Sequence, residues 1–514
     1  MNRRRFVQTS LAAAIAVSLP VSQGFTAILS ASMKVDADIN AVTGDGAEVT
    51  LKRAAVQELG ESLRGNLLLP GHEAYEQSRR VLNPSFDKRP ALIAQVTGTA
   101  DVRTAVDFAR ENRLLLAVKC GGHSAAGRST CDGGMMIDLS PFRDVRVDPV
   151  ARRARVTGGS LLAQVDHETM AYDLVTPMGT VSHTGVGGLV TGGGFGRVAR
   201  RFGLSIDNLT GVDVVTADGQ FRRANEQENP DLFWGVRGGG GNFGIVTSFE
   251  FRLHPMQGQV LGGPILFPIE RARDVLNMYA EYGPEAPDEL DMVFLMIRPP
   301  EGGSIASAVG PGGIADAVVG LLICYSGPEN AADRALAPIR RLGTPLVDGI
   351  QAMDYVALQR SGDIDDPRAR AWYLKSGFVP EIPAGLITAI VEGLEGHPSR
   401  TTKITYQQGG GAIGRVANDA TAFSHRDAAA NLLLGLDWGF VDDPAEHVAW
   451  IKQFWTRLEP FTQGFYVNDG DPDAYVTDKV IRNYRENYDR LVEIKNKYDP
   501  TNLFRLNANI RPTV

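Results

Sequence analysis

Two glycine-rich segments carry histidines at positions where a bound cofactor could meet them. The first is 119–124, with the sequence KCGGHS, and the second is 179–196, which includes His183. Glycine has no Cβ, so backbone amides in such segments can approach a pyrophosphate closely. A histidine in the same loop, such as His123, can then reach the reactive ring of that cofactor. The two segments therefore predict a site for a dinucleotide cofactor.

The sequence around these loops alternates between apolar and polar stretches, as in an α/β arrangement. The ranges 91–96, 114–118 and 135–139 predict short buried strands, and Thr99 is expected to cap a helix over 101–111. The strand over 114–118 leads directly into the loop that holds His123. Residues 30–88 are expected to be largely irregular. Further strands are predicted over 153–157, 212–216 and 245–253, and helices over 161–171, 275–282, 387–394, 447–458 and 484–498.

Three stretches match or approach the dinucleotide pattern G-x-G-x-x-G, but their contexts are wrong. The range 239–244 leads into a strand, 409–414 is followed by a poor helix, and 194–199 has no strand before it. The Rossmann fingerprint requires a strand, a tight turn and then the start of a helix. A Rossmann domain, and with it an NAD-dependent enzyme, is therefore disfavoured.

Composition excludes several other classes of protein. The chain has 514 residues, of which 43% are hydrophobic and 22% charged, as in an ordinary globular protein with more than one domain. A net charge of −8 argues against general binding to nucleic acid. Three cysteines do not make a disulfide framework, although Cys120 and Cys131 are candidates for one pair in an oxidising compartment. No cysteine and histidine spacing indicates a metal site.

The N-terminus has the pattern of a twin-arginine export signal. Arginines at positions 3–5 precede Phe6 and the apolar run 11–19, which is too short to span a bilayer. We expect a signal peptide over 1–31 and a periplasmic or secreted mature protein. That route carries folded proteins, which suits a protein that acquires its cofactor before export.

Taken in order, the glycine-rich segments and four further motifs resemble the berberine-bridge-enzyme-like branch of FAD-linked oxidoreductases. That branch lies within the vanillyl-alcohol-oxidase (p-cresol-methylhydroxylase-type, PCMH-type) superfamily. The resemblance covers nearly all of the mature chain, and the ordered set is far more specific than one loop. The motifs are KCGGHS at 119–124, the loop 185–196, RFGLSIDN at 201–208, DLFWGVRGGGGNFGIVT at 231–247, YVN at 466–468 and YDPTNLF at 498–504.

The resemblance implies an α+β fold. It places a two-subdomain PCMH-type FAD-binding domain over 87–257 and an α/β substrate-binding domain with an antiparallel sheet over 258–464. A C-terminal berberine-bridge-like segment, 465–514, is expected to return to the FAD domain. The ranges 406–413 and 421–426 resemble two strands that face the flavin.

The resemblance also implies covalent FAD, joined through His123 to the 8α-methyl group of the isoalloxazine. Relatives with a second link carry a cysteine in the second loop, at the position of Val181 here. Valine cannot form a thioether, so a single link through His123 is predicted. The residues expected to bind FAD are Cys120, Gly121, Gly122, His123, Ser124, Thr184, Gly187, Gly188, Gly193, Gly194, Asn208, Gly244, Val246 and Asn468, with the tail near Asn507 and Asn509 completing the pocket.

Three residues are candidates for catalysis: Tyr466, Asp469 and His183. Many relatives have a second tyrosine after their Tyr-x-Asn motif, and it helps to deprotonate the substrate; here Asp469 takes that position. A carboxylate can serve as the base if burial raises its pKa; the alternative is a solvated loop residue. Tyr466 either acts on the substrate or packs against the FAD domain. His183 either exchanges protons near the flavin or shapes its loop.

The implied activity is that of an FAD-linked oxidase. It would transfer hydride from a C–H bond next to oxygen or nitrogen, in a sugar, alcohol or amine, to flavin N5, and O2 would reoxidise the flavin to give H2O2. Thr184 replaces a valine that often admits oxygen in related oxidases, so a dehydrogenase with another acceptor stays open. A flavin-carrying or carbohydrate-binding protein with little catalysis is the alternative from a different class, motivated by Val181 and Asp469. We expect a small-molecule substrate and O2 as partners, no nucleic acid, and no membrane span in the mature protein.

Overall fold

The computed structural model describes residues 35–297, 317–363, 368, 370–393, 402–439, 443–470 and 472–514. The predicted export signal, 1–31, lies outside the described residues. Within them, no helix is both long enough and apolar enough to cross a membrane.

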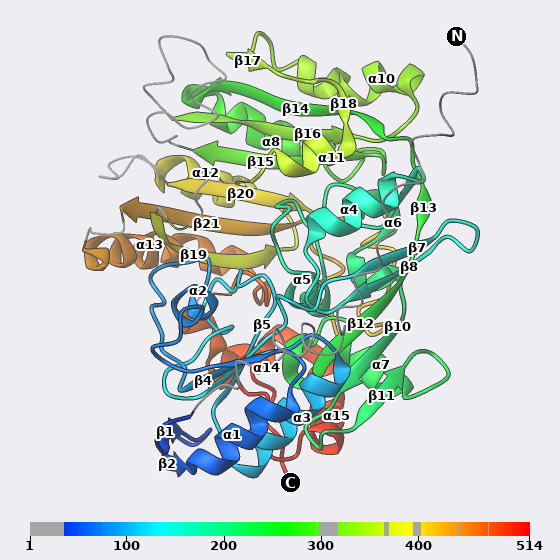
Figure 1. The fold of residues 1–514 in the computed structure, drawn as a ribbon. Coiled ribbons are helices and arrows are strands. Elements are labelled where there is room, and N and C mark those ends of the chain that lie inside the picture. The colour runs from blue at the N-terminus through cyan, green and yellow to red at the C-terminus, as the bar shows by residue number, and fades with distance from the viewer. Residues whose placement is uncertain are drawn as a thin grey trace, which may run out of the picture.

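A four-stranded sheet and a small hairpin form the N-terminal part of the molecule (Figure 1). The sheet has the order β3-β4-β6-β5, with β4 and β5 parallel to β6 and β3 antiparallel to β4. The expectation that 30–88 is irregular was wrong, because this range contributes both strands of the hairpin, β3 and two helices. The elements are β1 (Ile39–Val42), β2 (Glu48–Leu51), α1 (Arg53–Ser62), β3 (Asn66–Leu68), α2 (Tyr75–Arg79), β4 (Leu92–Gln95), α3 (Thr99–Glu111), β5 (Leu116–Lys119) and β6 (Met135–Asp138).

A second, five-stranded sheet is antiparallel and has the order β11-β10-β12-β8-β7. Its strands are β7 (Val145–Asp148), β8 (Arg153–Thr157), β10 (Leu209–Val215), β11 (Phe221–Ala224) and β12 (Ile245–Arg252). Val215 and Ile245 of this sheet join the apolar core of the first one, so the two sheets form one body. The elements that accompany it are α4 (Leu162–Met170), β9 (Leu174–Val175), α5 (Val186–Gly192), α6 (Ala199–Phe202), η1 (Ser205–Asn208), α7 (Pro230–Val236), η2 (Gly240–Asn242) and β13 (His254–Pro255).

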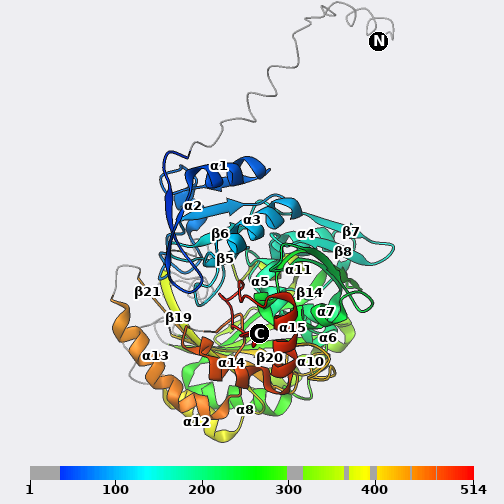
Figure 2. The ribbon, with the colours of Figure 1, turned by 90° about the horizontal axis from the view of Figure 1, so that it is seen from below.

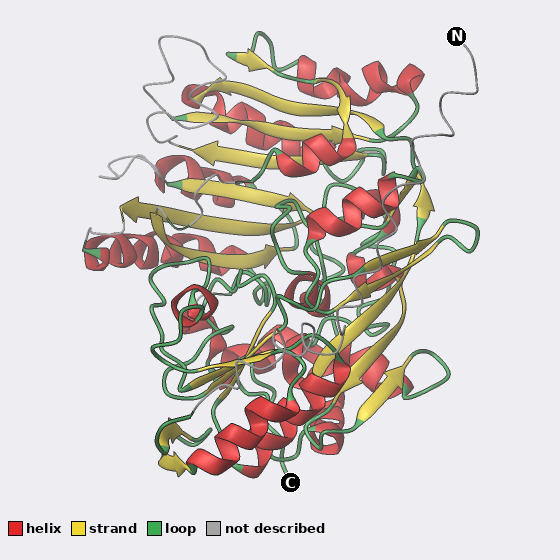
Figure 3. Ribbon diagram, viewed as in Figure 1, coloured by secondary structure: helices red, strands yellow, loops and turns green. Residues whose placement is uncertain are grey.

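An eight-stranded antiparallel sheet builds the other half of the molecule, and Figure 3 shows its long strands as one layer. The order is β17-β14-β16-β15-β20-β21-β19, and β18 also pairs with β14. The strands are β14 (Gln259–Pro268), β15 (Leu290–Ile297), β16 (Val318–Tyr325), β17 (Val347–Asp348), β18 (Gln351–Asp354), β19 (Arg370–Val379), β20 (Lys403–Gln408) and β21 (Ala430–Gly439).

Helices cover the outer face of this sheet, as the view from below shows (Figure 2). They are α8 (Ala272–Tyr282), α10 (Glu329–Arg340), α12 (Ala384–Gly393) and α13 (Pro444–Leu458). Their apolar sides share one core with alternate residues of the strands, among them Leu276, Ile390 and Phe454 against Phe294 and Leu432. The opposite face is left for contact with the first half of the molecule, where α11 (Tyr355–Arg360) packs against α4.

The arrangement confirms the predicted α+β class with an antiparallel sheet in its second half, but three local predictions were wrong. Thr99 lies inside α3, and Asp101 organises the helix start by accepting the amides of Arg64 and Thr97. The range 421–426 is a loop, not a strand. The helix predicted over 484–498 starts only at Tyr488, because Arg485, with φ of +49°, interrupts the helical conformation: α14 (Thr477–Tyr484) and η6 (Arg485–Asn487) precede α15 (Tyr488–Tyr498).

Candidate functional site

A cavity of about 360 Å³ lies where the glycine-rich loops, the large sheet and the C-terminal segment meet. Its wall is built from residues of 116–129, 179–195, 240–244, 466–475 and 504–508, together with Leu139 and with Gln407 at the end of β20. These segments come from widely separated parts of the chain. The cavity is therefore a product of the tertiary fold, and every predicted site residue can be placed relative to it.

The two glycine-rich loops touch through their backbones. A Cβ added at Gly121 would lie 2.4 Å from the amide nitrogen of Gly185, and a Cβ at Gly185 would lie 2.4 Å from that of Gly121. A side chain at either position would separate the loops. These two glycines therefore serve close packing, in addition to lining the cavity.

Gly188, unlike Gly121 and Gly185, is not packed against another part of the protein. It lies in the first turn of α5 and lines the cavity, and a Cβ there would meet no protein atom within 4 Å. The fold itself leaves room for a side chain at this point. The space beside Gly188 is thus space for a ligand, bordered by backbone.

His123 and His183 form a hydrogen-bonded pair at the junction of the loops. His123 Nε2 lies 2.7 Å from His183 Nδ1, and His123 Nδ1 lies 3.3 Å from the hydroxyl of Thr184. Burial, and to a smaller extent the neighbouring His183, lower the pKa of His123 to about 3. His123 is therefore a neutral imidazole near pH 7, the form that has a nucleophilic lone pair.

His183 stands behind His123 and is not among the residues that line the cavity. Its Nε2 is buried and has no hydrogen-bond partner among the described residues. The preceding residue, Ser182, anchors the loop to the other half of the molecule, because its amide donates to Asp363 Oδ1 at 2.8 Å and its hydroxyl bonds Asp363 Oδ2. Sequence reasoning missed Asp363, which lies 181 residues further along the chain.

Tyr466 braces the second glycine-rich loop. Its hydroxyl oxygen accepts the amide of Gly194 at 2.8 Å and Asn468 Nδ2 at 2.8 Å, and Asn468 Nδ2 also donates to the carbonyl of Leu189. Burial raises the pKa of the phenol, so it stays protonated near neutral pH. The side chain lines the cavity, but its hydrogen bonds hold Gly194 in place.

Asp469 places a carboxyl group in the wall of the same cavity, together with Gln407. Asn431, from β21, donates through Nδ2 to Asp469 Oδ2 at 3.1 Å and to Gln407 Oε1 at 2.8 Å. Burial raises the pKa of Asp469 to about 7, and the hydrogen bond from Asn431 opposes that rise. A carboxyl group with such a pKa can take up or release a proton near neutral pH.

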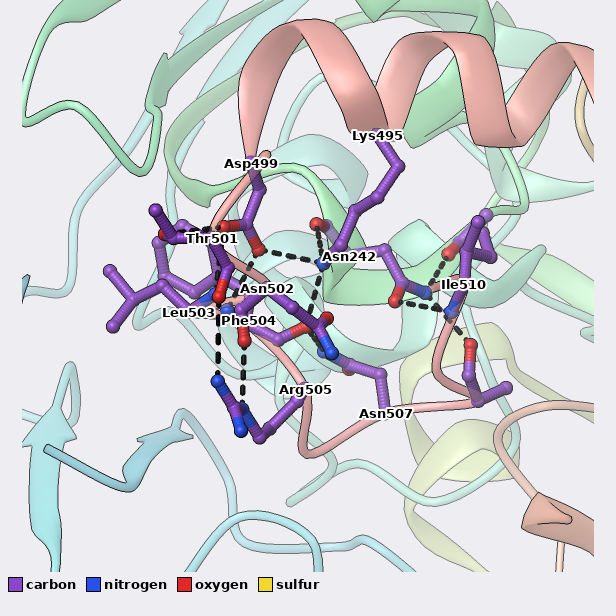
Figure 4. A network of polar contacts seen from close by, with 12 residues as sticks. Asn242, Lys495, Asp499, Thr501, Asn502, Leu503, Phe504, Arg505, Asn507 and Ile510 are labelled. Atoms are coloured by element: carbon purple, nitrogen blue, oxygen red, sulfur yellow. Dashed lines mark hydrogen bonds and ion pairs between the residues drawn. The ribbon is translucent and has the colours of Figure 1, made fainter. Parts of the chain in front are cut away.

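The C-terminal tail is held against the cavity by a buried polar network (Figure 4). Lys495 and Asp499 are both fully buried and lie 2.7 Å apart. Lys495 Nζ also donates to the carbonyls of Asn242 and Phe504, while Asp499 accepts the amides of Leu503 and Phe504. The network fixes the turn that carries 504–508 into the cavity wall.

Most of the predicted cofactor residues line this cavity. They are Cys120, Gly121, Gly122, His123, Ser124, Thr184, Gly187, Gly188, Gly244 and Asn468. Four others are not among the residues that line it, so the structure does not place them at the cavity: Gly193, Gly194, Asn208 and Val246. Asn208, for example, donates to the carbonyls of Phe202 and Leu204 and bonds His254 Nε2 at 2.6 Å.

Some lining residues carried no signal in the sequence. Arg128, Ser129 and Tyr475 belong to no cofactor motif that we recognised, yet all three line the cavity. Only their placement in the fold identifies them. The three cysteines are all free in the structure, so Cys120 and Cys131 do not form the candidate disulfide.

Comparison with known proteins identifies the family. The chain matches the family model described as FAD binding domain over residues 90–225 and the model described as berberine and berberine like over 465–511. It is 31% identical over 462 residues to an FAD-linked oxidoreductase of Dictyostelium discoideum, covering 89% of this chain and 97% of the relative. It is 28% identical over 464 residues to (R)-6-hydroxynicotine oxidase of Paenarthrobacter nicotinovorans, covering 88% of this chain and 97% of that protein.

A solved structure shows the same fold at similar coverage. Xylooligosaccharide oxidase from Myceliophthora thermophila C1 superposes with a TM-score of 0.79 and 26% identity, over 90% of this chain and 100% of that chain. The chain belongs to the berberine-bridge-enzyme-like family of FAD-linked oxidoreductases. It is an FAD-dependent oxidoreductase.

The residues of the cavity fit FAD. Gly188 leaves a cradle that a side chain would fill, the loops expose backbone amides without Cβ atoms, and a neutral imidazole lies at their junction.

Proposed function

We propose that the protein is an oxidase for a substrate whose reacting carbon carries oxygen or nitrogen, as in a sugar, an alcohol or an amine. FAD, when bound, supplies the hydride acceptor. Asp469 takes the proton from the O–H or N–H group of the substrate, and O2 is the final electron acceptor. The observation that carries the proposal is the Asp469 carboxyl, with a pKa of about 7, in the same cavity wall as His123.

The protein residues divide the remaining tasks. His123 provides the nitrogen for a single covalent link to the cofactor, and its neutrality supports that role. Val181 lines the cavity at the position where a second link would need a cysteine. Asn431 orients Asp469, and the tail residues 504–508 close the wall.

Acid precipitation tests the covalent link. The purified protein should be yellow, and its colour should stay in the pellet after precipitation with acid. His123→Ala should release the colour into the supernatant. A wild-type protein that releases its flavin under the same treatment contradicts the link.

A substrate panel tests the activity, and the names of the relatives suggest its members. The protein is mixed anaerobically with 6-hydroxynicotine, xylooligosaccharides and simple alcohols, and flavin absorbance is followed. Bleaching identifies a substrate, and admission of air should restore the colour and release H2O2. Rapid recovery with an artificial acceptor but not with air would identify a dehydrogenase instead.

A binding protein with little catalysis is the second candidate, and the Val181 and Asp469 departures favour it. Such a protein would hold FAD and would never bleach with any member of the panel. The raised pKa of Asp469 supports the enzyme, because a purely binding site has no use for a proton acceptor there.

Export through the twin-arginine route stays part of the proposal. N-terminal sequencing of the protein recovered outside the cytoplasm tests it. A mature N-terminus near residue 32 is expected, and recovery of the intact chain from the cytoplasm alone would contradict it.

A further inference from the structure

We propose that Arg128 and Ser129 form an anion subsite in the cavity, so that the substrate carries a carboxylate or a similar anionic group. The inference rests on the proposed function, because it names a chemical class for the substrate of that same cavity. Two consecutive polar side chains that line the cavity and have no side-chain hydrogen-bond partner among the described residues carry it.

Arg128 is a cation that has no counter-ion within the part of the chain that the structure describes. It is the only lysine or arginine among the described residues that line the cavity. Its guanidinium lies 4.8 Å from the ring centre of Tyr475, and no hydrogen bond or ion pair joins it to any described residue. Its Nε is buried and unpartnered. An arginine presents N–H donors in a planar fork that matches a carboxylate, so these donors are available to a ligand.

Ser129 adds a second donor beside the first. Its hydroxyl is buried, has no hydrogen-bond partner among the described residues, and belongs to a residue of the same cavity wall. Buried polar groups without partners are uncommon in folded proteins, and each one calls for a partner. One anionic group that accepts from Arg128 and Ser129 would satisfy both.

The loop holds Arg128 in place before any ligand arrives. The amide of Arg128 donates to the hydroxyl of Ser124 at 3.0 Å. Gly127, with φ of +63°, makes the turn in a conformation that favours glycine, and a Cβ there would lie 2.3 Å from the ring of Phe86. A preorganised donor loses little entropy on binding.

The contacts of Tyr475 place this subsite near Asp469. The hydroxyl of Tyr475, whose ring lies under Arg128, donates to the carbonyl of Val467 at 2.9 Å. Val467 is two residues from Asp469, and both line the cavity. Arg128 thus packs on a tyrosine whose hydroxyl is bonded two residues from the proposed base, so an anionic group held by Arg128 places the rest of its molecule on the side of Asp469.

Calorimetric titration of the holoenzyme tests the subsite with benzoate and its neutral analogue benzamide as probes. Wild type should bind benzoate at least about tenfold more tightly than benzamide. Arg128→Ala should abolish that preference, Arg128→Lys should keep part of it, and Ser129→Ala should reduce it. Arg146→Ala, which removes an exposed arginine of β7 outside the cavity wall, should leave the preference unchanged.

Equal affinities of wild type for the two probes would overturn the subsite. So would loss of FAD from Arg128→Ala, measured by flavin absorbance, because that result would assign Arg128 to the phosphates of the cofactor. Flavin content and substrate bleaching report on the proposed function separately. A protein that contains flavin but shows no benzoate preference contradicts the subsite alone.

Discussion

Tyr466 and Asp469 lie three residues apart on one loop, but their surroundings suit them to different tasks. The phenol of Tyr466 is committed to Gly194 and Asn468, and burial raises its pKa. The carboxyl of Asp469 has one donor, Asn431, and a pKa of about 7. Asp469 is therefore the residue suited to proton transfer at neutral pH, and Tyr466 fixes the geometry of the loop.

Activity should depend on the ionisation of Asp469. A base acts when deprotonated, so kcat/KM should rise with pH and level off above about pH 7. Asp469→Asn should lower kcat by roughly 10²–10⁴-fold, since an amide cannot accept the proton. The rise of kcat/KM with pH, the rising limb of the profile, should also disappear. Steady-state kinetics across pH measure both effects, and unchanged flavin absorbance shows that the cofactor site survives. Full activity of Asp469→Asn would exclude the role.

Asn431 offers a finer test of the same residue. Its hydrogen bond lowers the pKa of Asp469, so Asn431→Ala should move the rising limb to higher pH. A limb that stays in place while kcat falls would show that Asn431 has only a structural role. His183→Ala serves as the comparison, because His183 contacts His123 and not Asp469.

At the scale of elements, helix α5 contains a glycine that lowers the stability of the helix but leaves the cavity open. Glycine inside a helix is unfavourable by about 0.5–1 kcal/mol relative to alanine. Gly188 lies in α5, is exposed to the cavity, and has no protein neighbour that a Cβ would meet. The fold by itself would therefore accept alanine there.

Gly188→Ala should separate stability from cofactor binding. The free energy of unfolding of the flavin-free protein should stay the same or rise by up to about 1 kcal/mol, while the flavin content falls. Chemical denaturation and the ratio of flavin to protein absorbance measure the two quantities. Gly98→Ala, at the start of α3 and outside the cavity wall, should leave the flavin content unchanged. Normal flavin loading of Gly188→Ala would contradict the cradle.

Elements with strong apolar patterns were predictable from sequence. The strands β4, β5 and β6 and the helices α4, α8 and α13 appear within a few residues of their expected ranges, because burial imposes the periodicity that identifies them. Two helix starts were misplaced. Asp101 organises the start of α3 through a contact with the distant Arg64, and the positive φ of Arg485 delays the start of α15 to Tyr488.

At the scale of the molecule, two buried arginines join segments far apart in the chain. Arg426 binds Asp207 through two hydrogen bonds of 2.7 Å, across 219 residues. Arg200, fully buried, donates to the carbonyls of Ala286, Leu290 and Gly409 in the large-sheet half. These hydrogen bonds thus fix the position of one half of the molecule relative to the other around the cavity.

The Lys495–Asp499 pair should make the tail essential to both stability and cofactor binding. Lys495→Met leaves Asp499 buried without its cation, which should cost about 3–5 kcal/mol of unfolding free energy. Adding Asp499→Asn to Lys495→Met should cost less than the sum of the two single changes. Urea denaturation measures the unfolding free energies of the two single variants and the double variant. Flavin content should fall with Lys495→Met because residues of 504–508 line the cavity. Strict additivity would show that the two residues act independently.

The order of the motifs in the chain was enough to predict the family, the cofactor class, and a histidine among glycines, which the structure places in the cavity wall. Those features are local: a loop that lets amides approach a phosphate needs particular residues at particular spacings. Which side chains face one another across the cavity was decided only by tertiary structure. Burial in the cavity wall raises the pKa of Asp469 to about 7, although the hydrogen bond from Asn431 of β21 opposes that rise. Arg128 becomes a candidate ligand for an anion because no acidic side chain among the described residues pairs with it. Burial and pairing between distant residues determine these properties, and neither is encoded in any short stretch of sequence.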